Sequence, residues 1–181
     1  MIKRAEVIKA QKRALDMLKK AGIAVTNEEK RRIVVAEVGY GMLDTIGLEM
    51  LEYVNTGRVC SRELIQFPGQ TCPEHRHPPA AGGPGKEETF RCRYGKIFLY
   101  VPGKKTANPK AKVRRELRKY FTVWHEVILN PGEQYTLMPD TLHWFQAGSK
   151  GAIMSEFSTT SVDRADIFTD PNIKVILEVE D

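Results

Sequence analysis

The stretch Gly69-Gln-Thr-Cys-Pro-Glu-His75-Arg-His77, followed after a Pro/Gly-rich interruption by Lys86-Glu-Glu-Thr-Phe-Arg-Cys-Arg-Tyr-Gly95, decides the fold that we expect. The chain has four histidines, and three of them are His75, His77 and the later His143. Strand residues two positions apart point to the same face, so His75 and His77 can offer both imidazoles to one ion. A carboxylate and a third imidazole would complete the site. We therefore predict a metal site.

The length of 181 residues is that of one domain with a single core. We expect that domain to span residues 1–181, with an N-terminal helical extension over 1–32 and a β-barrel core over 33–181. No apolar run approaches the roughly eighteen residues that a membrane span needs, and the charged N-terminus lacks a signal segment. We expect a cytoplasmic protein without a membrane partner. Three cysteines without Cys-x-x-Cys spacing argue against a disulfide framework.

The net charge of +5 is concentrated in one segment, residues 104–119, which holds eight basic residues and one acid. No aromatic residues interleave these charges, as they would in a single-strand nucleic-acid site. A solvated flap between strands is therefore favoured over a nucleic-acid interface. We expect no nucleic-acid partner.

The hydrophobic pattern predicts helices first and strands afterwards. Residues 3–21 carry apolar positions on one helical face and stop at Gly22, and a second helix starts at Thr26 or Asn27. Residues 33–38 read as a strand, whereas 45–54 are ambiguous between helix and strand. Short strands separated by turn residues then describe an antiparallel sandwich or barrel. The expected strands are 58–67, 72–77, 87–94, 96–101, 120–129, 134–138, 142–148, 151–158 and 173–179.

Two motifs resemble those of the cupin superfamily. Gly69, His75-x-His77 and a glutamate six residues before Gly95 are similar to the first cupin motif, and Pro131-Gly132 with Pro139-Asp-Thr-Leu-His143 is similar to the second. The gap from the histidines to the glutamate is longer than usual, but its Pro and Gly residues can bulge outward. The second motif lacks its usual glycine. The resemblance implies an all-β jelly-roll barrel, the double-stranded β-helix, with the metal inside it on three histidines and a glutamate.

Within the cupins, the sequence resembles the D-lyxose isomerase family from about Ile33 to Pro171. That resemblance implies interconversion of D-lyxose and D-xylulose, and of D-mannose and D-fructose, with one divalent metal per chain, typically Mn²⁺. Fe²⁺, Co²⁺, Ni²⁺ or Zn²⁺ would suit the same ligands. The partner is then a small sugar, and by analogy with cupins we expect a homodimer. The matching segments are His75-Arg-His77-Pro, Gly85-Lys-Glu-Glu-Thr-Phe-Arg-Cys-Arg-Tyr-Gly95, Leu99-Tyr-Val-Pro102, Thr141-Leu-His-Trp-Phe-Gln-Ala-Gly148, Ser155-Glu-Phe-Ser158 and Asp166-Ile-Phe-Thr-Asp-Pro171.

Glu87 and Glu88 are neighbours on a strand, so only one of them can face the ion. The six-residue spacing to Gly95 selects Glu88 and leaves Glu87 facing outward. The expected ligands are therefore His75, His77, Glu88 and His143.

A hairpin closed by Gly148-Ser-Lys-Gly151 would place His143 directly opposite Glu156, so that Glu156 points into the metal cavity. A carboxylate beside a metal is a candidate general base. The alternatives are a fifth ligand or a group that orients His143. The resemblance implies the acid/base role for Glu156, which we favour.

Lys86 lies two residues from Glu88 and should share its face. There it could polarise a sugar oxygen or shuttle a proton, with a pKa lowered by burial near a cation, although a lysine after Pro-Gly is ordinarily a solvated loop residue. The resemblance implies an active-site lysine. Four further candidates for sugar contacts are weaker, because Phe90 and Tyr94 could equally fill the core and Asp163 and Asp166 could equally cap a turn.

These residues predict an aldose–ketose isomerase that transfers a proton through an enediol. The rival enzyme is an Fe(II) dioxygenase, and the rival outside catalysis is a metal-dependent sugar-binding module. A glutamate and a lysine facing the metal favour acid/base chemistry.

Overall fold

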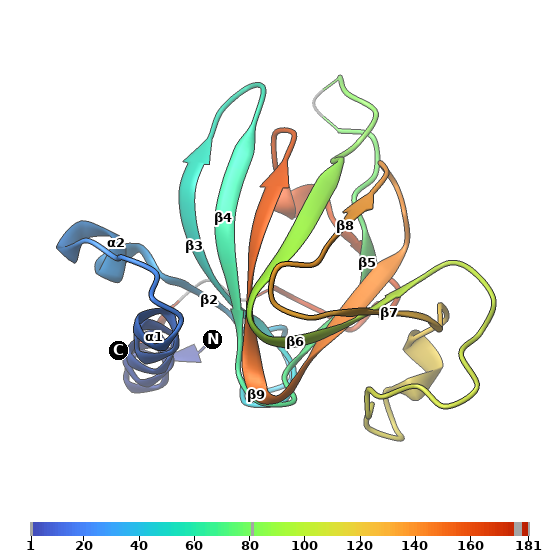
Figure 1. Cartoon of the computed structure of the whole chain (residues 1–181), viewed down its shortest axis with the longest axis horizontal. Helices are drawn as coiled ribbons and strands as arrows, with labels where there is room; N and C mark the ends of the chain where they lie inside the picture. The colour runs from blue at the N-terminus through green and yellow to red at the C-terminus, as the bar shows by residue number, and fades with distance from the viewer. Residues whose placement is uncertain (1, 81, 176–178, 181) are drawn as a thin grey trace.

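The computed structural model describes residues 2–80, 82–175 and 179–180, and it shows a strongly curled antiparallel sheet with two helices beside it (Figure 1). The predicted all-β class with N-terminal helices is confirmed. The helices are α1 Arg4–Lys20 and α2 Asn27–Arg32, with short 3₁₀ turns η1 Arg118–Tyr120 and η2 Asp163–Ala165. The strands are β1 Ile2–Lys3, β2 Val34–Ala36, β3 Leu48–Asn55, β4 Cys60–Gln66, β5 Thr71–Arg76, β6 Glu88–Val101, β7 His125–Leu129, β8 Gln134–Leu137, β9 His143–Ser158, β10 Ile167–Phe168 and β11 Val179–Glu180.

The two predicted helices are present, and each has a local cause. Gly22 ends the first with a backbone φ of +71°, a conformation that costs glycine little. The Thr26 side chain accepts a hydrogen bond from the Glu29 N–H, which caps α2. The ambiguous segment 45–54 contains β3. The predicted strand over 173–179 falls partly outside the described residues, and 173–175 form no strand.

Strands β6 and β9 each pair with three other strands and so connect most of the sheet. Both differ from the strands that the sequence predicted. Each was predicted as two short strands, with β9 interrupted by a hairpin at 148–151, but each runs unbroken through the expected break. The reason lies at their crossing, where a Cβ added to Gly95 would sit 1.9 Å from the Gly151 carbonyl oxygen. Gly95 and Gly151, both with positive φ, let the two strands bend against each other instead of turning back. The predicted hairpin was therefore wrong.

The sheet buries apolar side chains on both faces. Inside the barrel, Phe90, Leu99, Phe145 and Met154 belong to one cluster. Outside, α1 packs Ala14 and Leu18, among others, against the sheet face that carries Leu51, Ile65 and Ile153. The helix thus covers the outer face of this part of the sheet, while the inner cluster fills the barrel.

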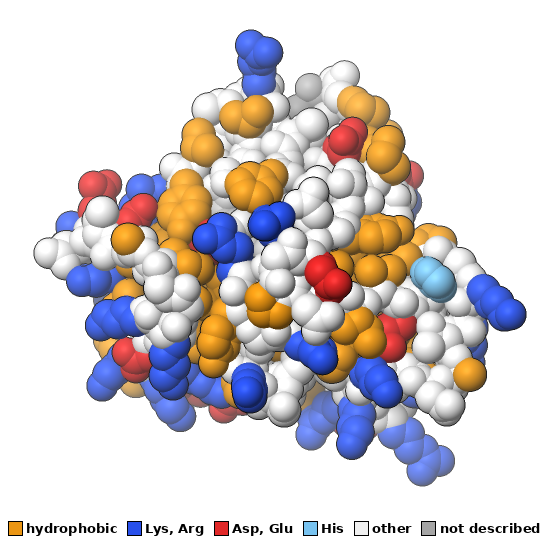
Figure 2. Space-filling view, viewed as in Figure 1, with side chains coloured by type: hydrophobic (Ala, Val, Ile, Leu, Met, Phe, Trp, Pro, Cys, Tyr) orange, Lys and Arg blue, Asp and Glu red, His pale blue; other side chains and the backbone are white. Residues whose placement is uncertain are grey.

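The basic segment 104–119 runs along the sheet as a flap. Its Ala111 and Leu117 are buried against an aromatic cluster in which Tyr100 stacks on Trp144 at a ring-centroid distance of 3.9 Å. Figure 2 shows Lys and Arg side chains gathered along the lower edge of the molecule. Neither of the helices in the described part of the chain is long and apolar enough to cross a membrane.

Glu49 on β3 is fully buried and provides a test of the packing. Burial raises the pKa of its carboxyl group to about 8, and the hydrogen bond from Gln70 (3.3 Å) offsets this only in part. The other oxygen has no hydrogen-bond partner among the described residues. The native state therefore favours the protonated carboxyl group.

Because the native pKa is raised, the native state binds more protons than the unfolded chain between the ordinary carboxyl pKa and about 8. This contribution to stability is complete below that window and is lost as the pH rises through it, with a slope of at most about 1.4 kcal/mol per pH unit. We expect Glu49→Gln to remove this loss, measured by urea unfolding from pH 5 to 9. Exposed Glu116→Gln is the control, and parallel pH curves for wild type and Glu49→Gln would contradict the assignment.

Candidate metal centre

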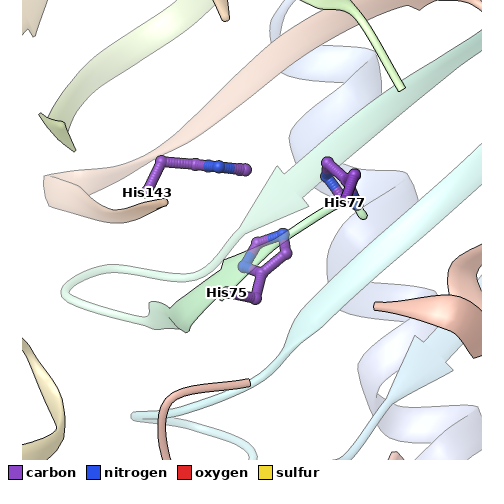
Figure 3. Close-up of side chains that lie close together, drawn as sticks. All are labelled: His75, His77 and His143. Carbon is purple, nitrogen blue, oxygen red and sulfur yellow. The ribbon is translucent and has the colours of Figure 1, made fainter. Parts of the chain in front are cut away.

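Three buried imidazoles converge at one end of the barrel (Figure 3). His75 lies on β5, His77 directly follows that strand, and His143 begins β9. The register pairs His75 with His143, and the spacing of two places His77 on the same side as His75. One ligand nitrogen from each histidine lies within 4.8 Å of the others. The structure therefore brings together all three histidines that the sequence selected.

The second ring nitrogen of each histidine is held by the protein. Nδ1 of His75 lies 2.8 Å from the Pro73 carbonyl, and Nδ1 of His143 lies 2.9 Å from the Thr141 carbonyl. A carbonyl oxygen can only accept, so these Nδ1 atoms donate and Nε2 is left to bind an ion. His77 Nδ1 is held in the same way by Asp166 Oδ1 at 2.6 Å. Asp166, a candidate for sugar contacts, thus contacts His77.

Glu88 adds a carboxylate to the three imidazoles. It begins β6 and is 1% exposed, and its Oε1 lies 3.1 Å from His77 Nε2 and 3.2 Å from His143 Nε2. Glu87 is exposed. This geometry supports the choice of Glu88, which stays a prediction.

Lys86 is buried between two carboxylates. Its Nζ lies 2.8 Å from Glu88 Oε2 and 3.0 Å from Glu156 Oε1. Burial alone would lower the pKa of this amine, but the charges of Glu88 and Glu156 outweigh it and raise the pKa above its ordinary value. The expectation of a lowered pKa is therefore wrong, and Lys86 is an ammonium group here.

Glu156 does point into the cavity, but for another reason than the predicted hairpin. His143 pairs with His75 instead, while Glu156 pairs with Phe90 on β6 and with Arg62 on β4. Directly opposed residues share a face of the sheet. Glu156 therefore lies beside Lys86 because β6 and β9 stay paired along their full length.

The charges of this cluster fit a divalent cation. Four carboxylates, Glu88, Glu156, Asp163 and Asp166, face two side-chain cations, Lys86 and Arg62. Burial alone would lower the pKa of His77, but the charge of Glu88 and the hydrogen bonds with Asp166 and Glu88 raise it to about 9. With all three imidazoles neutral, as metal binding requires, the four carboxylates exceed the two side-chain cations by two charges. The site also offers donors of the kind that bind divalent metals.

One further atom supports a bound divalent ion. His143 Nε2 is buried, and within the described part of the chain it has no hydrogen-bond partner. A buried polar atom left unpaired is costly unless something binds it. The residues present therefore fit a divalent ion, and His75, His77, Glu88 and His143 are the side chains that would hold it.

A cavity of about 220 Å³ opens beside these groups. Its polar side holds Lys86, Glu156 and Arg62, and Phe90 forms part of the apolar wall. Tyr94, predicted on the same face, lies outside it and packs against the cluster under α1. The cause is a break in the β6–β9 register between Cys92 and Tyr94, which reverses the alternation of faces.

Arg62 is the site residue that the sequence analysis missed. Its Nε donates to Glu156 Oε2 at 2.9 Å and its Nη1 donates to Asp163 Oδ2 at 2.8 Å. The available signal was its spacing of two from Leu64 in the expected strand 58–67, which places a charged residue on an inward face. A buried arginine normally has an acidic partner nearby.

The chain is similar to known proteins both in sequence and in fold. A family model described as D-lyxose isomerase matches residues 58–181. A D-lyxose/D-mannose isomerase of Thermosediminibacter oceani is 60% identical over 181 residues, which is 100% of both chains. A D-lyxose ketol-isomerase of a Thermofilum species is 58% identical over 179 residues, 99% of each chain.

The solved structure of ligand-free L-ribose isomerase from Cellulomonas parahominis is similar in fold. Its TM-score is 0.81, with 99% of this chain and 98% of that chain covered, at 15% sequence identity. At this identity the likeness concerns the fold alone. It supports the curled barrel described above.

We expect Glu88→Ala to lose the bound divalent ion, because the substitution removes the carboxylate between two imidazoles. Elemental analysis of the purified protein measures the ion directly. Glu87→Ala is the matched control and should keep it. The opposite pattern would show that the register of β6 has been misassigned.

We expect Asp166→Asn to weaken ion binding by about 10- to 100-fold, because His77 loses the carboxylate that orients its ring. Titration of Mn²⁺ into metal-free protein, followed by calorimetry, gives the affinity. Asp140→Asn, at an exposed carboxylate paired with Arg76, is the control. Equal affinities in both variants would remove this role from Asp166.

Proposed function

The chain belongs to the D-lyxose isomerase family, and from this membership we propose that it interconverts D-lyxose and D-xylulose, and D-mannose and D-fructose. It is an aldose–ketose isomerase that uses a divalent metal. We propose Mn²⁺ as that metal, one ion per chain, held by His75, His77, Glu88 and His143. The name of the Thermosediminibacter oceani relative contains both aldoses, D-lyxose and D-mannose.

The observation that carries the proposed chemistry is the row Glu88, Lys86, Glu156. Consecutive members lie 2.8 and 3.0 Å apart, and all three are buried in the wall of one cavity. Isomerisation of an aldose requires one proton to move between C1 and C2 and another between their oxygens. A buried carboxylate and a buried ammonium group beside the ion supply groups for both transfers.

In the proposed reaction, Glu156 takes the proton from C2 of the open-chain aldose and returns it to C1 of the enediol. The hydroxyl proton moves from O2 to O1, and Lys86 is the group placed to carry it. Lys86 also donates hydrogen bonds to the oxygen that gains negative charge. When bound, the divalent ion supplies Lewis-acid polarisation of the sugar oxygens. Phe90 and Phe145 in the cavity wall exclude water, which strengthens these interactions.

The two rival functions are not favoured. An Fe(II) dioxygenase does not need a carboxylate and an ammonium group paired in the cavity, and a sugar-binding module does not need a base. The remaining parts of the proposal are a single domain over residues 1–181, a homodimer and a cytoplasmic location.

We expect the purified protein with Mn²⁺ to convert D-lyxose into a ketose, measured by a colorimetric ketose assay. Glu156→Gln should lower kcat by about 10²- to 10⁴-fold, the usual contribution of a general base, while it keeps the ion. Glu87→Gln, at an exposed carboxylate, should retain full activity. A wild-type protein that forms no ketose would contradict the proposed function.

Proton transfer also predicts that solvent tritium enters the product at C1 or C2, because the proton held by Glu156 exchanges with water. A hydride shift would leave the product unlabelled. Unlabelled product from an active enzyme would count heavily against proton transfer through an exchangeable carboxyl group.

A further inference from the structure

Arg62 contacts Glu156, the proposed base, but has no role of its own in the proposed proton transfers. It lies on β4 in direct register with Glu156 on β9, and its side chain is almost fully buried. Its Nε donates to Glu156 Oε2 at 2.9 Å. Burial alone would lower the pKa of the guanidinium group, but the charges of Glu156 and Asp163 raise it well above its ordinary value. Arg62 is therefore a permanent cation fixed beside the base.

The hydrogen bonds of Glu156 show what this contact controls. Oε2 accepts from Arg62, while Oε1 accepts from Lys86 at 3.0 Å and from Ser158 Oγ at 3.1 Å. An ionised carboxylate has about four acceptor positions, so roughly one remains for the proton of the substrate. With donors on both oxygens, the carboxylate cannot rotate, and the free position has a fixed direction.

Arg62 is itself held from the other side. Its Nη1 donates to Asp163 Oδ2 at 2.8 Å, and Asp163 Oδ1 accepts from Ser161 Oγ at 2.6 Å. Partial burial would raise the pKa of Asp163, whose side chain is 48% exposed, but Arg62 and Ser161 lower it to about 2. Asp163 thus holds Arg62 through one oxygen and is itself held through the other, and its predicted sugar contact stays a prediction.

A buried ion pair by itself adds little stability, because desolvation of both charges offsets their attraction. The same arginine placed on a catalytic carboxylate has another use, since its planar fork fixes direction as well as charge. Two donors aimed at different carboxylates hold the guanidinium plane in one orientation. Neutralising the charge of Glu156 would not require the guanidinium group to be held in one orientation.

We propose that Arg62 is a positioning residue that aims Glu156 at the substrate, and that Asp163 holds Arg62 in place. This inference rests on the proposed function, in which Glu156 is the base. Misplacement of a reacting group by about 1 Å can cost on the order of 10²-fold in rate. Loss of Arg62 should therefore act on kcat.

The experiment compares Arg62→Gln, Arg62→Lys and Asp163→Asn with wild type in the presence of Mn²⁺ and D-lyxose. We expect Arg62→Gln to lower kcat by about 10- to 100-fold, with KM and metal content within about twofold of wild type. Arg62→Lys should recover part of the loss, because it restores the charge without the fork. Asp163→Asn should lower kcat by a few-fold and leave KM unchanged. The control is Arg91→Gln, because Arg91 is exposed on the outer side of the sheet, where it is hydrogen-bonded to Gln134.

A wild-type kcat in Arg62→Gln would overturn the proposal. In a folded Arg62→Gln variant, an activity loss that follows the loss of bound metal would also overturn it, because that pattern marks a purely structural role. If Arg62→Gln does not fold, Asp163→Asn decides, and an unchanged kcat in that variant would overturn the proposal. A wild-type enzyme that forms no ketose would overturn the proposed function as well, so the two failures are distinguishable.

Discussion

Negative charge buried at the end of an apolar barrel must be balanced, and this requirement organises the site. Glu88 and Glu156 are each 1% exposed, and desolvated carboxylates are stable only when cations or hydrogen-bond donors surround them. Lys86 bridges the two, and Arg62 neutralises the outer one. The three imidazoles and Glu88 leave room for the divalent charge that completes the balance. The arrangement that makes the cluster stable is also the one that places the proposed base beside the proposed metal ion.

The sequence predicted the part of this site that depends on local geometry. Alternation of faces along one strand is enough to join His75 with His77 and to allow only one of Glu87 and Glu88 to face the ion. The spacing to Gly95 then selected Glu88. The helix limits also followed from local signals at Gly22 and Thr26. Local geometry could not predict His143 as a ligand, because it lies far from His75 and His77 along the chain. It was predicted from the resemblance of its segment to the second cupin motif.

The rest of the site depends on how strands β6 and β9 cross. Local sequence patterns do not encode such a crossing. The glycines at 148 and 151 read equally as a turn or as a bend, and only the contact between Gly95 and Gly151 decides between them. Tyr94 was misplaced because one register break reverses every later face. The pKa of Lys86 was misjudged because its direction depends on two carboxylates, one of them 70 residues away along the chain. Arg62 was missed because its partners lie on β9 and on the following turn.

The proposed metal donors come from three separate segments of the chain, at β5, β6 and β9, that meet only when the barrel has closed. An unfolded chain cannot present these four side chains to one ion, so the ion binds the native state selectively. By mass action, each tenfold rise in free metal above the dissociation constant then adds about 1.4 kcal/mol to the free energy of unfolding. If the proposed donors hold the ion, the free metal concentration of the surroundings contributes to the stability of the protein as well as to its activity.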